Sequence, residues 1–178
     1  MIPCQHGVIR TADPDDAHTL KQYYDSVGPR AAKLDRKREV VTPTTDELQE
    51  LLTRKENEMG GLYAIEDRGG RVQGFCSLRG VSRERRMGEA LLMLIEDRFY
   101  AQPLAAEALD FLLDFAFNTL FLNKLAAHCL ENETAARELL IRAGFESEGT
   151  QRDVVFTEGR WHDLEAFACF RRNYRSHV

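Results

Sequence analysis

Residues 90–95 read Ala-Leu-Leu-Met-Leu-Ile, an uninterrupted apolar run in a chain of which 30% is charged. A strand with one face in solvent alternates apolar and polar residues, whereas a strand that is covered on both faces has no need to alternate. The run therefore predicts a central strand with a layer of other elements on each side. The segments around it should supply the neighbouring strands and the covering helices.

The segment after the run predicts a helix, a strand and a second helix. In the first helix an apolar stripe lies opposite a polar one: Leu104, Ala108, Leu112 and Phe115 against Glu107, Asp110, Asp114 and Asn118. The apolar stripe should pack on the sheet. Residues 124–130 read as a strand, and residues 133–143 as a helix that ends at Gly144, which suits the left-handed conformation past a helix end.

The segments farther out complete the order of elements, and helix caps and turn residues mark their ends. They are a strand at 8–11, a helix from Asp13 to about Val27 before Gly28-Pro29, a charged connection at 33–39, a helix from Thr44 to Met59, strands at 62–66 and 72–78 joined across Gly69-Gly70, and a last hairpin of 153–157 and 161–170 around Glu158-Gly159. This order predicts an α/β (α+β) fold, a mixed sheet with helices on both faces.

Length and composition exclude several classes of protein. A chain of 178 residues with 43% apolar content predicts one domain, residues 1–178. The net charge of −5 argues against a nucleic-acid partner, and no apolar run approaches the roughly 20 residues that span a bilayer. We expect a cytoplasmic protein with no membrane partner. The four cysteines have no paired spacing, so we expect neither a metal site nor a disulfide framework.

Residues 90–170 contain a series of short motifs in a characteristic order. The fragments are Glu107-Ala108-Leu109, 113–117, 122–125, Glu131-Asn132-Glu133, Ala143-Gly144-Phe145, Glu148-Gly149 and 159–163. Together they resemble the GNAT superfamily of N-acyltransferases, in the branch with the ribosomal-protein, spermidine and nucleotide-amino-sugar N-acetyltransferases. The resemblance implies a GNAT fold, with a mostly antiparallel twisted sheet of about six to seven strands.

The resemblance also implies the reaction and its cofactor. An acyl group would pass from acetyl-CoA, or another acyl-CoA, to a primary amine of a small molecule or of a protein N-terminus, and a homodimer is compatible with the family. The residues that would bind the cofactor fall in three groups: Met93, Leu94 and Ile95 along pantetheine; Tyr100, Ala101, Gln102, Pro103, Leu104 and Ala105 as the phosphate loop; and Asn132 on pantetheine. Asn132 could instead cap the helix that begins near Glu133.

The phosphate loop departs from the family pattern because Pro103 replaces its central glycine, which removes one N–H donor. Two readings stay open. Pro103 starts a helix beside a decayed cofactor site, or the N–H groups of Gln102, Leu104 and Ala105 still hold phosphate with the help of the helix dipole. For Tyr100, a hydrogen bond to an acyl or phosphate oxygen competes with the role of an aromatic plug over the loop.

The base that removes the proton of the amine has two candidates, His128 and Glu96. His128 has the suitable chemistry near neutral pH, and Glu96 stands at the end of the apolar run. Leu140 replaces the tyrosine acid of many relatives. Cys129 should point away from His128 on a strand, which argues against a cysteine nucleophile. A catalytically reduced GNAT module that binds CoA, a metabolite or a protein is the alternative function.

Overall fold

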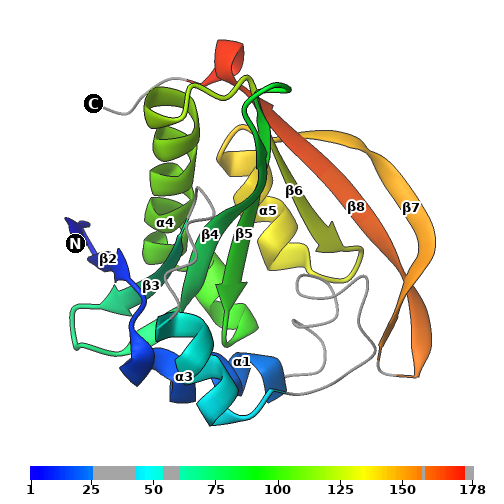
Figure 1. The fold of residues 1–178 in the computed structure, drawn as a ribbon. Helices are drawn as coiled ribbons and strands as arrows, with labels where there is room; N and C mark the ends of the chain where they lie inside the picture. Colours follow the sequence, from blue (N-terminus) through cyan, green and yellow to red (C-terminus); the bar gives the residue numbers. More distant parts are fainter. Residues whose placement is uncertain (26–42, 54–60, 158, 175–178) are drawn as a thin grey trace.

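The computed structural model describes residues 1–25, 43–53, 61–157 and 159–174, and its strands form one twisted sheet in the order β1-β2-β3-β4-β5-β6-β8-β7 (Figure 1). The strands are β1 (Ile2–Pro3), β2 (Gly7–Thr11), β3 (Leu62–Asp67), β4 (Val72–Ser82), β5 (Met87–Leu94), β6 (Lys124–Leu130), β7 (Glu146–Thr157) and β8 (Arg160–Phe170). The α-helices are α1 (Ala17–Asp25), α3 (Thr45–Thr53), α4 (Pro103–Asp114) and α5 (Thr134–Arg142). Three short 3-10 helices are η1 (Pro14–Asp16), η2 (Asp97–Ala101) and η4 (Arg171–Asn173), and η3 (Phe115–Thr119) is a π-helical turn that continues α4.

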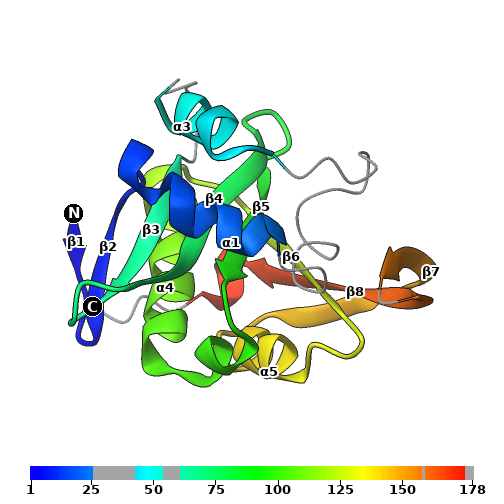
Figure 2. The same ribbon diagram turned by 90° about the horizontal axis from the view of Figure 1, so that it is seen from below.

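The sheet is mixed and mostly antiparallel, as predicted. Among the described strands, β5 and β6 form the one parallel pair. Helices α1 and α3 cover one face, and α4 and α5 cover the other (Figure 2). Eight strands replace the expected six to seven, because β1 adds a two-residue strand beside Val8 and Ile9. A two-residue strand is too short to carry a periodic pattern.

Strand β5 is central and covered on both faces, which confirms the prediction from its apolar run. Leu91 and Met93 are buried in one cluster with Tyr23 of α1. Leu92 and Leu94 are buried on the opposite face in a cluster with residues of α4. Alternate side chains of this one strand therefore join the two hydrophobic layers.

The predicted helix starts near the N-terminus are confirmed. Asp13 caps η1 in a reciprocal capping box with Asp16, and η1 leads directly into α1. Thr44 and Glu47 form the predicted capping box at the start of α3. The expected stop at Gly28-Pro29, the charged connection at 33–39 and the end of the second helix at Met59 lie outside the described residues.

The C-terminal half follows the prediction except in β7. Strand β6 has the predicted bounds, and Gly144 ends α5 with a φ of 87°. Strand β7 begins at Glu146, seven residues before the predicted Asp153, and its pairing with β8 shifts twice, between Ser147 and Gly149 and between Gln151 and Val155. These irregularities, together with solvent exposure of most of the strand, removed the alternating pattern that sequence reasoning needs.

Candidate functional site

The site begins where β5 and β6 part. The two strands pair only between residues 87–89 and 124–126. Beyond these pairs they diverge, as Figure 1 shows, although β5 continues to Leu94 and β6 to Leu130. A narrow cavity of about 30 Å³ lies at the divergence, between the strands and α4 and α5. Its free space holds only one or two water molecules.

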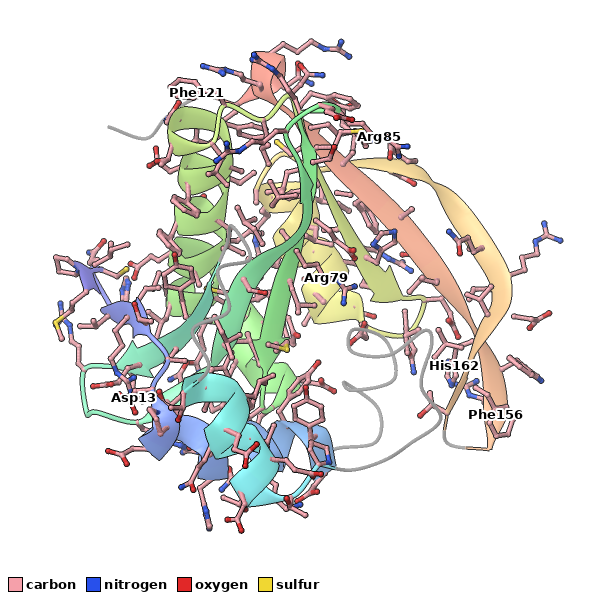
Figure 3. The ribbon with its side chains drawn as sticks, viewed as in Figure 1. Asp13, Arg79, Arg85, Phe121, Phe156 and His162 are labelled. Atoms are coloured by element: carbon pink, nitrogen blue, oxygen red, sulfur yellow. The ribbon has the colours of Figure 1, made fainter. Side chains whose placement is uncertain are left out.

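Three charged or ionisable side chains meet at the edge of this cavity. Arg79 of β4 donates to both carboxylate oxygens of Glu89 on β5, at 3.0 Å from Nε and 2.9 Å from the terminal nitrogen. Oε1 of Glu89 also lies 2.8 Å from Nδ1 of His128 on β6. Three neighbouring strands thus place their side chains in one chain of contacts on the α1 face, where Figure 3 shows Arg79 near the middle of the sheet.

The contacts determine the charge of Glu89. Burial alone would raise the pKa of this carboxyl group, but the hydrogen bonds from His128 and Arg79 outweigh burial and lower the pKa to about 2. Glu89 is therefore an anion throughout the physiological range. An anion at Nδ1 favours the tautomer with the proton on Nδ1, which leaves the lone pair of Nε2 of His128 for a ligand.

The backbone of β5 presents polar groups toward β6 beyond the last pair. Ile95 donates its N–H to Gln73 of β4 at 3.0 Å. Because successive residues of a strand direct their backbone groups to opposite sides, Met93 also faces β4, whereas Leu92 and Leu94 face the divergence.

The side chain of Tyr100 is hydrogen-bonded to the free backbone groups of Leu92 and Leu94. Its hydroxyl donates to the Leu92 carbonyl at 3.0 Å and accepts from the Leu94 N–H at 3.4 Å, and its side chain is buried at the cavity. Of the three residues expected along pantetheine, Leu94 alone turns its N–H toward the divergence.

The predicted phosphate loop is folded into η2 and the first turn of α4. The N–H of Gln102 donates to Phe99 at 3.0 Å, and the N–H of Ala105 donates to Gln102 at 3.2 Å. Pro103 is the first residue of α4 and has no N–H to donate. Of the N–H groups of Gln102, Leu104 and Ala105, which were expected to hold phosphate, that of Leu104 makes no hydrogen bond within the loop. An open hollow of about 400 Å³ adjoins this helix start, with Arg68 on its wall.

Glu96 lies apart from the chain of contacts around His128. It pairs with Arg98 at 2.6 Å and with Arg71 at 2.9 Å, and Arg98 first among them lowers the pKa of this carboxyl group. Seven residues of extended chain separate it from Glu89, about 23 Å at roughly 3.3 Å per residue. The structure therefore does not bring the two candidate bases together.

Comparison with known proteins shows the family to which this fold and site belong. Residues 8–146 match the profile of the acetyltransferase (GNAT) domain. This chain belongs to the GNAT acetyltransferase family. It is accordingly an N-acetyltransferase, an acyltransferase that acts on amines with an acyl-CoA donor.

Several similar proteins align with nearly the whole length of this chain. An uncharacterized N-acetyltransferase p20 from Bacillus licheniformis is 27% identical over 176 residues, 93% of each chain. The putative ribosomal N-acetyltransferase YdaF from Bacillus subtilis is 26% identical over 96% of this chain and 94% of its own. Spermidine N-acetyltransferase from Vibrio cholerae, solved with CoA and spermine, has a TM-score of 0.81 at 19% identity, covering 96% and 99% of the chains. At this identity the structural likeness shows the fold.

The remaining predicted residues of this GNAT protein take the following positions. Asn132 is exposed in the turn before α5, and Glu133, not Asn132, is the N-cap residue, so the capping alternative for Asn132 was wrong by one position. Leu140 lines the cavity, where it can supply no proton. Cys129 is buried on the opposite side of β6 from His128, as predicted, with its sulfur 3.9 Å from Glu165.

The thiols of the GNAT protein are shielded. Cys76, Cys129 and Cys169 are buried, and Cys4 is half-buried. Burial raises the pKa of Cys4 and Cys76, and it raises the pKa of Cys169 to about 11. A thiolate nucleophile therefore has no favourable position among these groups.

Sequence reasoning missed Arg79 and Glu89. The sequence did contain one signal, because Glu89 is the single charged residue between Gly88 and Ile95 in an otherwise apolar strand. A carboxylate in such a strand requires a partner. Arg79 could not be identified as that partner without the register of β4 and β5, which places the two residues directly opposite each other.

A second histidine–carboxylate pair lies on the same sheet face. His162 of β8 is fully buried, and its Nδ1 lies 2.8 Å from Oε1 of Glu131. Among the described residues, three buried polar atoms lack a hydrogen-bond partner: Oε2 of Glu131, Oγ1 of Thr157 and Nε2 of His162. Figure 3 shows His162 toward the hairpin of β7 and β8. Buried polar atoms of this kind are commonly satisfied by water or by a ligand.

Proposed function

We propose that this GNAT protein transfers the acetyl group of acetyl-CoA to a primary amine of a small molecule or of a protein N-terminus, with His128 as the general base. The observation that carries the proposal is the chain of contacts from Arg79 through Glu89 to His128, at the point where β5 and β6 part. A histidine fixed by a carboxylate at Nδ1 can accept a proton at Nε2 and share the resulting charge with the carboxylate.

His128, Glu89 and Arg79 each have a separate role in the proposed reaction. An amine attacks only when its nitrogen is neutral, and Nε2 of His128 takes the proton that the nitrogen loses. Glu89 stabilises the imidazolium that forms, while Arg79 holds the carboxylate in one orientation. The new N–C bond forms as the C–S bond breaks. A thiol with a pKa of about 8.5 can leave as a thiolate, so the lack of an acid at Leu140 does not prevent the step.

The backbone of β5 and the start of α4 fit a CoA ester. When bound, acetyl-CoA supplies the thioester carbonyl that the amine attacks. The Leu92 carbonyl and the Leu94 N–H would pair with the two amides of pantetheine, one through its N–H and the other through its C=O, and the Leu104 N–H and the dipole of α4 would face the phosphates. The narrow cavity, with Leu139 and Leu140 on its wall, favours a short acyl group such as acetyl.

The acceptor is proposed from the polar atoms of the α1 face. Leu130 pairs with Leu164, and His162 precedes Leu164 by two residues on β8, so His162 lies on the same face as His128. Within the part of the chain that the structure describes, its Nε2 and Oε2 of Glu131 have no hydrogen-bond partner. With the ring proton on Nδ1, toward Glu131, both atoms can accept. They favour an amine that carries further N–H groups. Spermidine N-acetyltransferase and the putative ribosomal enzyme among the similar proteins suggest polyamines and protein N-termini as the first acceptors to test.

The proposal is tested by following thiol release from acetyl-CoA with polyamines, simple amines and peptides that have a free N-terminus. His128→Gln should lower kcat by about 10²-fold and remove the acidic limb of the pH–rate profile. His18→Gln, which changes an exposed histidine of α1, is the matched control.

Glu96→Gln separates the two candidate bases. If this variant loses activity while His128→Gln stays normal, Glu96 is the base. Absence of turnover with every amine, together with no binding of any acyl-CoA in a calorimeter, would contradict the proposed function and favour the reduced module.

A further inference from the structure

Tyr100 holds the two backbone groups of β5 that a CoA ester would need. Its hydroxyl donates to the Leu92 carbonyl and accepts from the Leu94 N–H, at 3.0 and 3.4 Å. A neighbouring strand makes the same pair of bonds with the N–H of one amide and the C=O of the next, because the two groups of a single trans amide point in opposite directions. Pantetheine carries two amides and can supply this donor and this acceptor. The tyrosine hydroxyl therefore substitutes for a donor and an acceptor of a neighbouring chain at an unpaired stretch of strand.

We infer that Tyr100 is a displaceable occupant of the pantetheine position: its hydroxyl pairs with β5 in the free enzyme and leaves when the two amides of an acyl-CoA take its place. The inference rests on the proposed function, since it concerns the donor side of the same cleft. It adds a residue that controls how readily the donor binds.

The burial of Tyr100 explains why the occupant is needed. Leu92 and Leu94 lie in the core, where an unpaired N–H or C=O is costly. The tyrosine satisfies both groups while β5 and β6 are apart, and its ring helps to reduce the cavity to about 30 Å³. Without this side chain the divergence of the strands would leave two buried polar groups unpaired.

The same contacts show why the occupant can leave. The bond from Leu94 is long at 3.4 Å, and Tyr100 stands on the five-residue η2, outside β5 and α4. Rotation of the side chain would free the cleft without breaking the ladder between β4 and β5. Binding of acyl-CoA then includes the cost of this rotation, which lowers the apparent affinity by the fraction of molecules that are open.

Displacement of Tyr100 should affect the binding of ligands that contain pantetheine and leave the binding of the nucleotide part of CoA unchanged. A ligand with the pantetheine amides must displace the hydroxyl, whereas adenosine 3′,5′-bisphosphate has no amide and leaves Tyr100 in place. Tyr100→Phe removes the competing hydroxyl and leaves Leu92 and Leu94 unpaired until a ligand arrives. The variant should therefore bind acetyl-CoA more tightly than the unmodified enzyme and bind the bisphosphate with unchanged affinity.

Calorimetry with both ligands tests this on the unmodified enzyme, Tyr100→Phe and Tyr63→Phe. Tyr63 packs against Phe111 and Phe115 away from the cleft, so its variant controls for loss of a tyrosine hydroxyl. We expect Tyr100→Phe to lower the Kd for acetyl-CoA about 2- to 10-fold, the range of one ordinary hydrogen bond. Free Tyr100→Phe should also melt at a lower temperature and gain more from acetyl-CoA.

A crystal structure with acetyl-CoA gives an independent readout, in which the Tyr100 hydroxyl should have left the Leu92 carbonyl. Equal or weaker binding of acetyl-CoA by Tyr100→Phe, or a complex that keeps the Tyr100 contact, would overturn the inference while the proposed function stands. If the unmodified enzyme and both variants bind no acetyl-CoA, the proposed function fails and the inference fails with it.

Discussion

At the scale of the residue, Glu89 shows how a charge is kept inside an apolar strand. A carboxylate that loses its water without gaining partners costs several kcal/mol. Glu89 gains three hydrogen bonds from two side chains, which outweigh the effect of burial on its pKa. The contacts that stabilise the anion also fix the ring of His128.

Glu89→Gln tests this positioning role. The variant should lower kcat about 10-fold or more, because the neutral amide neither fixes the tautomer of His128 nor stabilises its imidazolium as well. The Kd for acetyl-CoA should change little, because Glu89 acts through His128 and not on the donor. The measurements are kcat and the calorimetric Kd, beside Glu50→Gln on the exposed side of α3. A parallel loss of kcat and of donor binding would indicate that Glu89 is structural only.

Residues of the site could be predicted only where their own chemistry was sufficient. His128 was recognised because imidazole suits a base near neutral pH, and its opposite orientation to Cys129 followed from the period of a strand. The role of Glu89 depends on Arg79 and His128 across two strand pairings. A register of this kind depends on the whole sheet, so no local pattern contained it.

At the scale of the element, the connection from β5 to α4 differs from the phosphate loop that the family resemblance implies. It forms the 3-10 helix η2, and the N–H groups of Gln102 and Ala105 are used inside it. Pro103 starts α4 with a fixed φ and no donor. A phosphate at this helix start would depend on the Leu104 N–H, on the helix dipole and on nearby cations such as Arg68.

Pro103→Gly restores one donor at the start of α4. We expect the variant to keep its fold, to lose about 1 kcal/mol of unfolding free energy because glycine is more flexible in the unfolded chain, and to bind acetyl-CoA several-fold more tightly. Titration calorimetry and urea unfolding measure the two effects. Pro43→Gly is the control, because Pro43 precedes α3, which covers the face of the sheet opposite to α4 (Figure 2). Unchanged affinity would show that this loop does not contact the phosphates.

Elements with a strong period or clear caps were predictable, and irregular ones were not. The bounds of β6 and the capped starts of η1 and α3 follow from local residues. Strand β7 has two pairing shifts and a long exposed stretch, so its first half had no alternation to detect. The phosphate loop that the resemblance implies at 100–105 gave no indication of the 3-10 helix η2.

At the scale of the whole molecule, one arginine joins strand β2 to the 3-10 helix η1 and to strand β3. Arg10 of β2 pairs with Asp16 of η1 at 2.7 Å and with Glu66 of β3 at 2.8 Å. Asp16 is buried, which would raise the pKa of its carboxyl group, but the hydrogen bond from Arg10 lowers it. The α1 layer is thereby attached to the sheet through a partly buried ion pair, in which Asp16 is buried and Arg10 is partly exposed.

The stability of the molecule should fall in acid. The folded pKa of Asp16 is below its unfolded value, and that of Glu89 is about 2, so both groups stabilise the fold above pH about 4 and lose this contribution as the pH falls through their folded values. Asp16→Asn should cost about 2 kcal/mol at pH 7, the range of hydrogen bonds to a charged group, and less at pH 3. Urea unfolding at the two pH values measures the difference.

Asp25→Asn is the control for this experiment, because Asp25 pairs with Lys21 on the surface of α1 and should change stability little at either pH. An equal cost of Asp16→Asn at pH 7 and pH 3 would contradict the assignment of the acid sensitivity to this pair.

The shielded cysteines determine how the reaction of this enzyme can be observed. A colorimetric disulfide reagent reacts with thiolates, and the folded protein presents three buried thiols and one half-buried thiol, with raised pKa values at Cys4, Cys76 and Cys169. The free thiol of CoA reacts readily under the same conditions. The absorbance that grows during turnover therefore reports product with little background from the catalyst. In denaturant the same reagent counts four thiols per chain, which calibrates the concentration of enzyme in the cuvette.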